Sequence, residues 1–214
     1  MPRHPRATAL WLLIFVTALL WSAFQPFDRL TWLLEVLPAL IGLAVLAATH
    51  TTFPLTPLTY WLILVHAVIL MIGGHYTYAQ VPLFNWLRDA LDLSRNHYDR
   101  LGHLAQGFVP AIIAREILLR RSPLVRGKWL FFIVVCICLA ISAVYEFIEW
   151  WVALAIGLDA EAFLGLQGDV WDTQTDMFLA MIGAIAALLT MTRHHDHQLR
   201  QLDNELQKSA GPSR

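Results

Sequence analysis

Residues 129–151 read WLFFIVVCICLAISAVYEFIEWW, and this stretch decides the fold class of the chain. It contains no charged side chain before Glu146. A helix needs about 20 apolar residues to cross the hydrocarbon core of a bilayer. Only helices and closed barrels satisfy all of their backbone hydrogen bonds in lipid. The stretch therefore predicts a transmembrane helix and, with it, an integral membrane protein.

The composition of the whole chain agrees with that prediction. Of its 214 residues, 57% are hydrophobic and 14% are charged, and the mean hydropathy is +0.55. A soluble domain carries about 25% charged residues. The formal net charge of -1 excludes the basic surface that nucleic acid requires. We expect the lipid bilayer as a partner and no nucleic acid.

Hydropathy divides the chain into about six membrane spans followed by a polar segment. The span nearest the N-terminus is longer than a secretory signal core and has no Ala-x-Ala cleavage site, so we expect it to be retained. The predicted fold is an all-α, polytopic transmembrane helical bundle, with one domain at 1–192 and a cytoplasmic polar tail at 193–214. The predicted spans are 7–24, 32–49, 58–74, 100–120, 129–151 and 173–192.

Positive charge sets the predicted orientation, because Lys and Arg stay on the cytoplasmic side. The segment 120–128 carries most of the loop charge, whereas 158–171 has acidic residues and no Lys or Arg. Six spans then place both termini in the cytoplasm. We expect a multi-pass protein of the bacterial inner membrane, whose acidic connections face outward.

In this orientation, polar side chains from four helix ends meet at the outer side of the bundle. Carboxylates are costly near hydrocarbon, so several at one depth indicate a site. The residues that converge are His75, Asp99, His103, Glu146, Glu149, Asp169, Asp172 and Asp176.

Helical spacing supports this convergence. Asp99, His103 and Gln106 are spaced i, i+4, i+7 and share one helix face. Pro110 removes a backbone hydrogen bond one turn below, so we expect a kink that opens a small polar cavity. The last span continues below its acidic residues with small residues that favour close packing on another helix. These are Ala180, Gly183, Ala184 and Ala187.

Imidazole mixed with carboxylate suits a divalent metal such as zinc or manganese. Our hypothesis is a metal-dependent enzyme acting on a lipid-linked or other envelope substrate, with a spare carboxylate as general base. The metal ligands would come from His75, His103, Asp169, Asp172 and Asp176. The catalytic carboxylates would be Glu146, Glu149 and Asp99.

Two other interpretations stay open. In the first, the polar residues only hold the helices together, with Glu146 or Glu149 paired to Arg95 or Arg100. In the second, the chain transports a cation or a small solute. The inner half of such a path would offer only His66 and Glu116 as ionisable groups.

The inner end of the bundle carries two further features. Glu116, Arg115 and Arg120 are predicted to form a set of salt bridges at the inner interface. The run His194-His195-Asp196-His197 is predicted to be part of a solvated tail.

Five strings of sequence resemble the YjdF-type bacterial inner-membrane proteins. This resemblance covers nearly the whole chain apart from the tail, and it implies a multi-span inner-membrane protein without naming an activity. The strings are FDRLTWLLEV (27–36), GGHYTYA (73–79), YDRLGHLAQGF (98–108), YEFIEWW (145–151) and QGDVWDTQTDM (167–177).

A second likeness is to the VanZ-like membrane proteins. Asp-x-x-x-His, Glu-x-x-Glu and an Asp before a small-residue helix occur here in the same order. The chain departs from that pattern in Asp176, where Asn is common, and in the added segment around His75. This likeness implies a role at the cell envelope.

Overall fold

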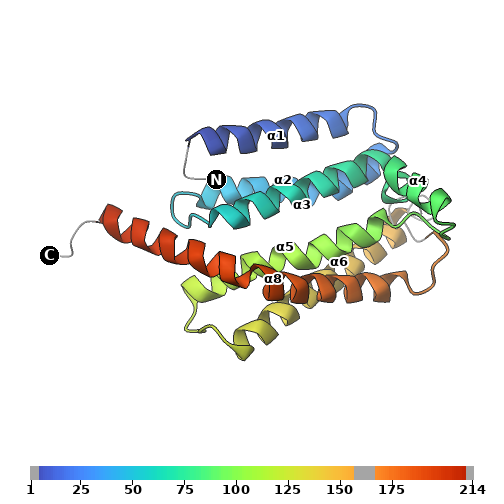
Figure 1. The fold of residues 1–214 in the computed structure, drawn as a ribbon. Coiled ribbons are helices and arrows are strands. Elements are labelled where there is room, and N and C mark those ends of the chain that lie inside the picture. The colour runs from blue at the N-terminus through green and yellow to red at the C-terminus, as the bar shows by residue number, and fades with distance from the viewer. Residues whose placement is uncertain (1–4, 157–166, 211–214) are drawn as a thin grey trace.

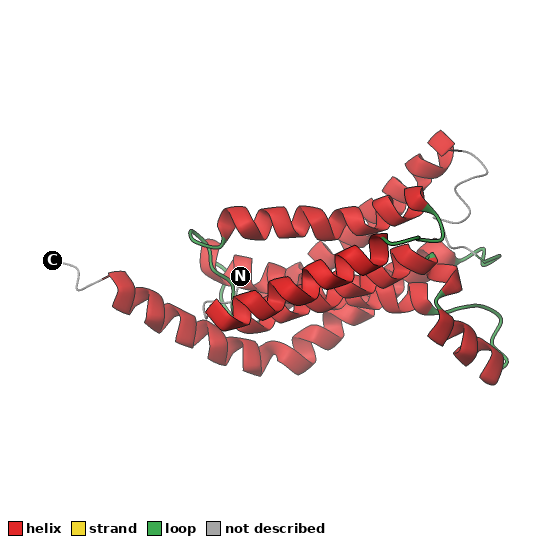
Figure 2. Ribbon diagram, turned by 90° about the horizontal axis from the view of Figure 1, so that it is seen from above, coloured by secondary structure: helices red, strands yellow, loops and turns green. Residues whose placement is uncertain are grey.

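The computed structural model describes residues 5–156 and 167–210, which are helical with short connections and contain no strand. The all-α prediction is confirmed. The long helices run side by side along one common direction (Figures 1 and 2). The helices are α1 (Pro5–Ala23), α2 (Arg29–Thr49), α3 (Pro57–Tyr76), the 3-10 turn η1 (Tyr78–Gln80), α4 (Pro82–Ala90), α5 (Tyr98–Arg121), α6 (Lys128–Ile156) and α8 (Asp172–Ala210).

Five of these helices, α1, α2, α3, α6 and α8, are long and apolar enough to cross a membrane. The fourth predicted span, α5, does not reach that hydropathy. Its 24 residues nevertheless make a helix of about 36 Å, longer than the hydrocarbon core of about 30 Å. Because α5 packs against α3, α6 and α8, much of its surface faces protein rather than lipid. A helix so enclosed can carry polar residues that a lipid-facing helix cannot.

The six long helices form two groups of three, each with its own hydrophobic core. In the first group, α1 and α2 pack on α3, and the Trp11 indole donates a 2.8 Å hydrogen bond to the Tyr60 carbonyl. In the second, α6 and α8 pack on α5 around Ile112, Val134 and Ala184. The groups meet where α3 contacts α5. A cavity lined by residues of both groups lies between them.

The pairing of α5 with α8 is the most extensive helix contact in the described chain. A Cβ atom on Gly107 would lie 1.7 Å from the Ala180 carbonyl oxygen, and one on Gly183 would lie 2.1 Å from that of Leu104. The two backbones therefore touch directly, as they do in glycine-mediated membrane interfaces. The prediction that the small-residue stripe of the last span faces the bundle is confirmed, because Ala180 is fully buried.

The structure corrects the prediction that the run His194–His197 is solvated, because His195 is fully buried. Helix α8 continues without interruption to Ala210 and extends past the other helices (Figure 1). His195, Leu199 and Leu202 are spaced i, i+4, i+7 and are buried, so this part of α8 still packs against the bundle. Helix α1 begins and α8 passes at this same end of the molecule, opposite α4 (Figure 1).

Candidate functional site

His103 lies among carboxyl groups supplied by three helices. Its Nε2 atom is 3.5 Å from Asp99 Oδ1, one turn earlier on α5, and 3.8 Å from Asp176 Oδ2 on α8. Its Nδ1 atom is 3.9 Å from Glu146 Oε1 on α6 and 3.1 Å from Gln106 Oε1. We call Asp99, His103, Glu146 and Asp176 the His103 cluster. All four side chains are buried.

Three members of the cluster lie close enough together to hold one metal ion. Asp99, His103 and Asp176 each offer one ligand atom, and these atoms lie within 4.8 Å of one another. Ligands bound to zinc at about 2.0–2.2 Å lie closer together than this upper bound. Modest rotation of the side chains would therefore bring the three atoms onto one ion.

Several buried oxygens in the cluster have no hydrogen-bond donor among the residues that the structure describes. They are Asp99 Oδ2, Glu146 Oε1 and Asp176 Oδ1, together with the nearby Ser142 Oγ. Buried polar atoms nearly always have a partner, because an unsatisfied one costs about 1–3 kcal/mol. The free acceptor positions belong to the same side chains that surround His103. They leave room for a further electropositive partner.

Two arginines neutralise the other acidic residues at this end of the bundle. Arg95 contacts Asp172 closely, and its guanidinium lies 3.4 Å from Asp169 Oδ2 and 3.5 Å from Asp99 Oδ2. Arg100 Nη2 lies 2.5 Å from Asp169 Oδ2. The hydrogen bond from the Trp171 backbone N–H and the Arg100 guanidinium both hold the pKa of Asp169 below its usual value. Asp169 and Asp172 are thus neighbours of the His103 cluster with partners of their own.

A small cavity of about 160 Å³ opens beside the cluster, between the two groups of helices. That volume holds several water molecules, since one needs about 10–15 Å³ on this measure. The Tyr145 hydroxyl donates a 3.2 Å hydrogen bond to Glu35 on one wall. Burial and the Glu35 carboxyl raise the pKa of the Tyr78 phenol, which therefore stays a neutral donor. The lining includes Glu35, Pro38, His66, Tyr78, Asp99, His103, Gln106, Pro110, Tyr145 and Glu149.

The comparisons with known proteins agree with this architecture. A family described as predicted membrane protein (DUF2238) matches residues 7–197. The chain belongs to this DUF2238 family. It is 54% identical over 184 residues to the inner membrane protein YjdF of Escherichia coli (strain K12), which covers 86% of this chain and 88% of the relative. No solved structure matches the chain.

Membership in the DUF2238 family confirms the resemblance to YjdF-type proteins. With its apolar helices, it makes the chain a multi-pass protein of the bacterial inner membrane. The likeness to VanZ-like proteins stays a prediction. Neither comparison names a substrate or a ligand, so the activity of this DUF2238 protein has to be argued from its site.

Two predicted site residues of this DUF2238 protein lie apart from the His103 cluster. The Nδ1 atom of His75 lies 3.0 Å from the Ser22 carbonyl oxygen, and its ring lies tilted against that of Trp21, with the ring centres 4.6 Å apart. His75 therefore joins the end of α3 to the end of α1. Glu149 lines the cavity one turn beyond Glu146. Among the residues that the structure describes, Arg95 and Arg100 form their ion pairs with aspartates, and none of these pairs involves Glu146 or Glu149.

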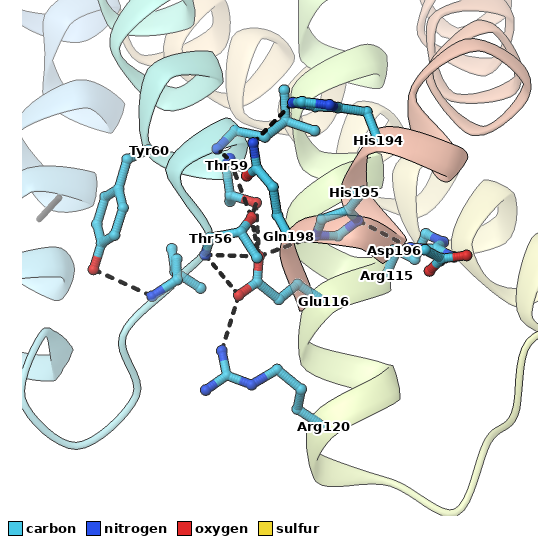
Figure 3. A network of polar contacts seen from close by, with 12 residues as sticks. Thr56, Thr59, Tyr60, Arg115, Glu116, Arg120, His194, His195, Asp196 and Gln198 are labelled. Atoms are coloured by element: carbon cyan, nitrogen blue, oxygen red, sulfur yellow. Dashed lines mark hydrogen bonds and ion pairs between the residues drawn. The ribbon is translucent and has the colours of Figure 1, made fainter. Parts of the chain in front are cut away.

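A second buried polar group lies at the opposite end of the bundle, around Glu116 (Figure 3). The fully buried Glu116 carboxylate accepts hydrogen bonds from the Thr56 backbone N–H at 2.9 Å and from the Thr59 hydroxyl at 2.7 Å. Arg120 Nη1 lies 2.9 Å and His195 Nε2 3.1 Å from its oxygens. We call this set the Glu116 network. It joins the start of α3 to α5 and α8.

The Glu116 network continues outward through α8. Arg115 contacts His195 Nδ1 at 3.0 Å and Asp196 at 2.7 Å, and Arg126 reaches the same Asp196 oxygen at 2.9 Å. The predicted pair of Glu116 with Arg120 is present, while Arg115 pairs with Asp196. Sequence analysis missed the part played by His195. The helical spacing of His195 with Leu199 and Leu202 was the signal that would have revealed it.

Proposed function

We propose that this chain binds a divalent cation in the His103 cluster and uses it in a reaction at the cell envelope. The observation that carries the proposal is the meeting of Asp99, His103 and Asp176 in one buried group within 4.8 Å. Mixed carboxylate and imidazole ligands favour zinc, manganese or iron over magnesium or calcium. Helical bundles commonly build such sites from side chains on facing helices.

The balance of charge supports a cation. Arg95 and Arg100 offset Asp169 and Asp172, and Arg95 also lies near Asp99. Among the residues that the structure describes, the basic side chain beside Asp176 and Glu146 is His103. Burying carboxylates without compensating positive charge costs several kcal/mol per ion. A divalent ion would supply that charge and would satisfy Asp176 Oδ1, which has no donor among the residues that the structure describes.

The cavity indicates what such an ion would act on. A metal ion acidifies bound water toward neutral pH, and a nearby carboxylate can take up the proton. Glu149 lines the cavity and is the general base we assign. At about 160 Å³, the cavity is smaller than the usual ligand pocket of about 300–1,000 Å³. It admits the reacting group of a lipid-linked envelope substrate, while the rest of that substrate stays in the bilayer or outside.

Elemental analysis of the detergent-purified protein tests the proposal. The samples are the wild type, His103→Ala, Asp176→Asn and His197→Ala, each incubated with Zn²⁺ or Mn²⁺ and then desalted. His197 is exposed on α8 and serves as the matched control. We expect one equivalent of metal in the wild type and in His197→Ala, and loss of metal in the two cluster variants. A folded wild type that retains no metal would refute the proposal.

A further inference from the structure

A groove on another part of the surface runs between α2, α3 and α5. Its volume is about 520 Å³, and it shares no lining residue with the His103 cavity. The walls are aliphatic along most of its length, with Val45, Ile63, Ile113 and Ile117. Val45 is 54% and Ile117 43% exposed, so the groove is open on its outer side. In a bilayer, that side faces lipid chains.

Gly42 leaves part of this groove empty. A Cβ atom added at Gly42 would have no neighbour within 4 Å, in contrast to the tightly packed Gly107 and Gly183. The groove volume falls within the range of about 300–1,000 Å³ that ligand pockets occupy.

One end of the groove is polar and positively charged. Thr49, Thr52 and Arg121 line this end. The Arg121 guanidinium lies 4.9 Å from the centre of the Phe53 ring, while Arg120 lies 3.9 Å from it. Arg120 is held by Glu116 and by the Pro54 carbonyl. Arg121 forms no ion pair with any residue that the structure describes, so its charge remains available.

We propose that this groove binds an anionic phospholipid, with one acyl chain along α2 and α5 and the phosphate at Arg121. Charge complementarity selects the headgroup: guanidinium binds phosphate strongly, and a basic site beside membrane helices favours lipids of net negative charge. The aliphatic walls match an acyl chain, and the charged end of the groove matches the headgroup. In the predicted orientation, this end of the groove faces the cytoplasmic leaflet.

Native mass spectrometry of the full chain in detergent, with added phosphatidylglycerol or phosphatidylcholine of identical acyl chains, tests the proposal. The wild type should prefer phosphatidylglycerol about fivefold, as expected for one arginine near a membrane surface. Arg121→Gln should bring the ratio of the two lipids close to one. Arg29→Gln, at the opposite end of α2, is the matched control and should keep the preference.

Gly42→Leu tests the acyl chain separately from the headgroup. Because the added side chain enters open space, the fold should hold, and the binding of both lipids should weaken together. Equal binding of the two lipids by the wild type would overturn the proposal. A preference that survives Arg121→Gln would do the same. Unchanged lipid binding in Gly42→Leu would show that the acyl chain lies outside the groove, and it would refute the groove as the lipid site.

Discussion

At the scale of single residues, the acidic end of the bundle separates into two environments. Asp169 and Asp172 face arginines, whereas Asp176 and Glu146 face one histidine. Residues only a few positions apart in sequence thus have different partners. The distinction matters for experiments, because substitutions in the first set should change stability, and substitutions in the second should change ligand binding.

Asp169 provides a test of the first environment by pH. Its pKa is lowered in the folded protein, so its ionised form stabilises the fold above the ordinary unfolded pKa of about 3.9, and that contribution is lost as the pH falls through the folded pKa. Asp169→Asn cannot lose a charge. We therefore expect the Tm of the wild type in detergent to fall more between pH 5 and pH 3 than that of the variant. Equal losses would show that the ion pairs with Arg95 and Arg100 do not contribute.

The spacing of residues along one helix predicted part of the site correctly, as His103 shows. It could not predict contacts between helices, as His75 shows. Asp99 and His103 share a face of α5, and that relation follows from helix geometry alone. His75 sits at the same end of the bundle, but it turns toward α1. Sequence gives the depth of a residue in the membrane, yet not which neighbouring helix it faces. Which helix a side chain faces depends on how the helices pack.

At the scale of elements, α5 shows why hydropathy undervalues an enclosed helix. Of the six long helices that the structure describes, it is the one without a stretch apolar enough to count as a membrane span, and it packs against three others. Its contact with α8 has no space for side chains at Gly107, where the Ala180 carbonyl fills the position of a Cβ atom. The stability of the bundle should therefore be sensitive to a single methyl group there.

Gly107→Ala tests that contact, and Gly42→Ala is its matched control. The added methyl at Gly107 forces α5 and α8 apart, and overpacking of this kind costs about 1–3 kcal/mol or more. At Gly42 the same methyl meets open space. Thermal unfolding in detergent should show a clear fall in Tm for Gly107→Ala and little change for Gly42→Ala. A similar Tm for both variants would contradict the backbone contact.

At the scale of the whole molecule, polar groups occupy both ends of the bundle. The His103 cluster lies at the end near α4, and the Glu116 network lies at the other end (Figure 3). The Glu116 network also links the two groups of helices, because Thr56 and Thr59 belong to the first group and His195 to the second. Loss of the Glu116 network should therefore weaken the packing of the two groups of helices against each other, and not only the packing of one helix.

His195→Ala tests this link, with His197→Ala as the control two residues further along α8. Removing the buried imidazole leaves Glu116 and Arg115 without one partner each, which costs about 1–3 kcal/mol. The exposed His197 should be replaceable within about 0.5 kcal/mol. Denaturation in mixed micelles would measure the free energy of unfolding of both variants. Equal stability of the two variants would mean that the Glu116 network does not hold the groups together.

The continuity of α8 has a mechanical consequence. This helix is fastened to α5 at three heights, by Asp176 beside His103, by the glycine contacts in the middle, and by His195 beside Glu116. Because these contacts lie along the whole length of the two helices, α5 and α8 cannot slide or rotate relative to each other without breaking all of them. Helix α2 packs mainly on α3, and it is joined to the second group of helices by the hydrogen bond from the Tyr145 hydroxyl to Glu35. We therefore expect any opening of the His103 cavity to separate α2 from α6 at the Tyr145–Glu35 hydrogen bond, and to leave α5 and α8 together.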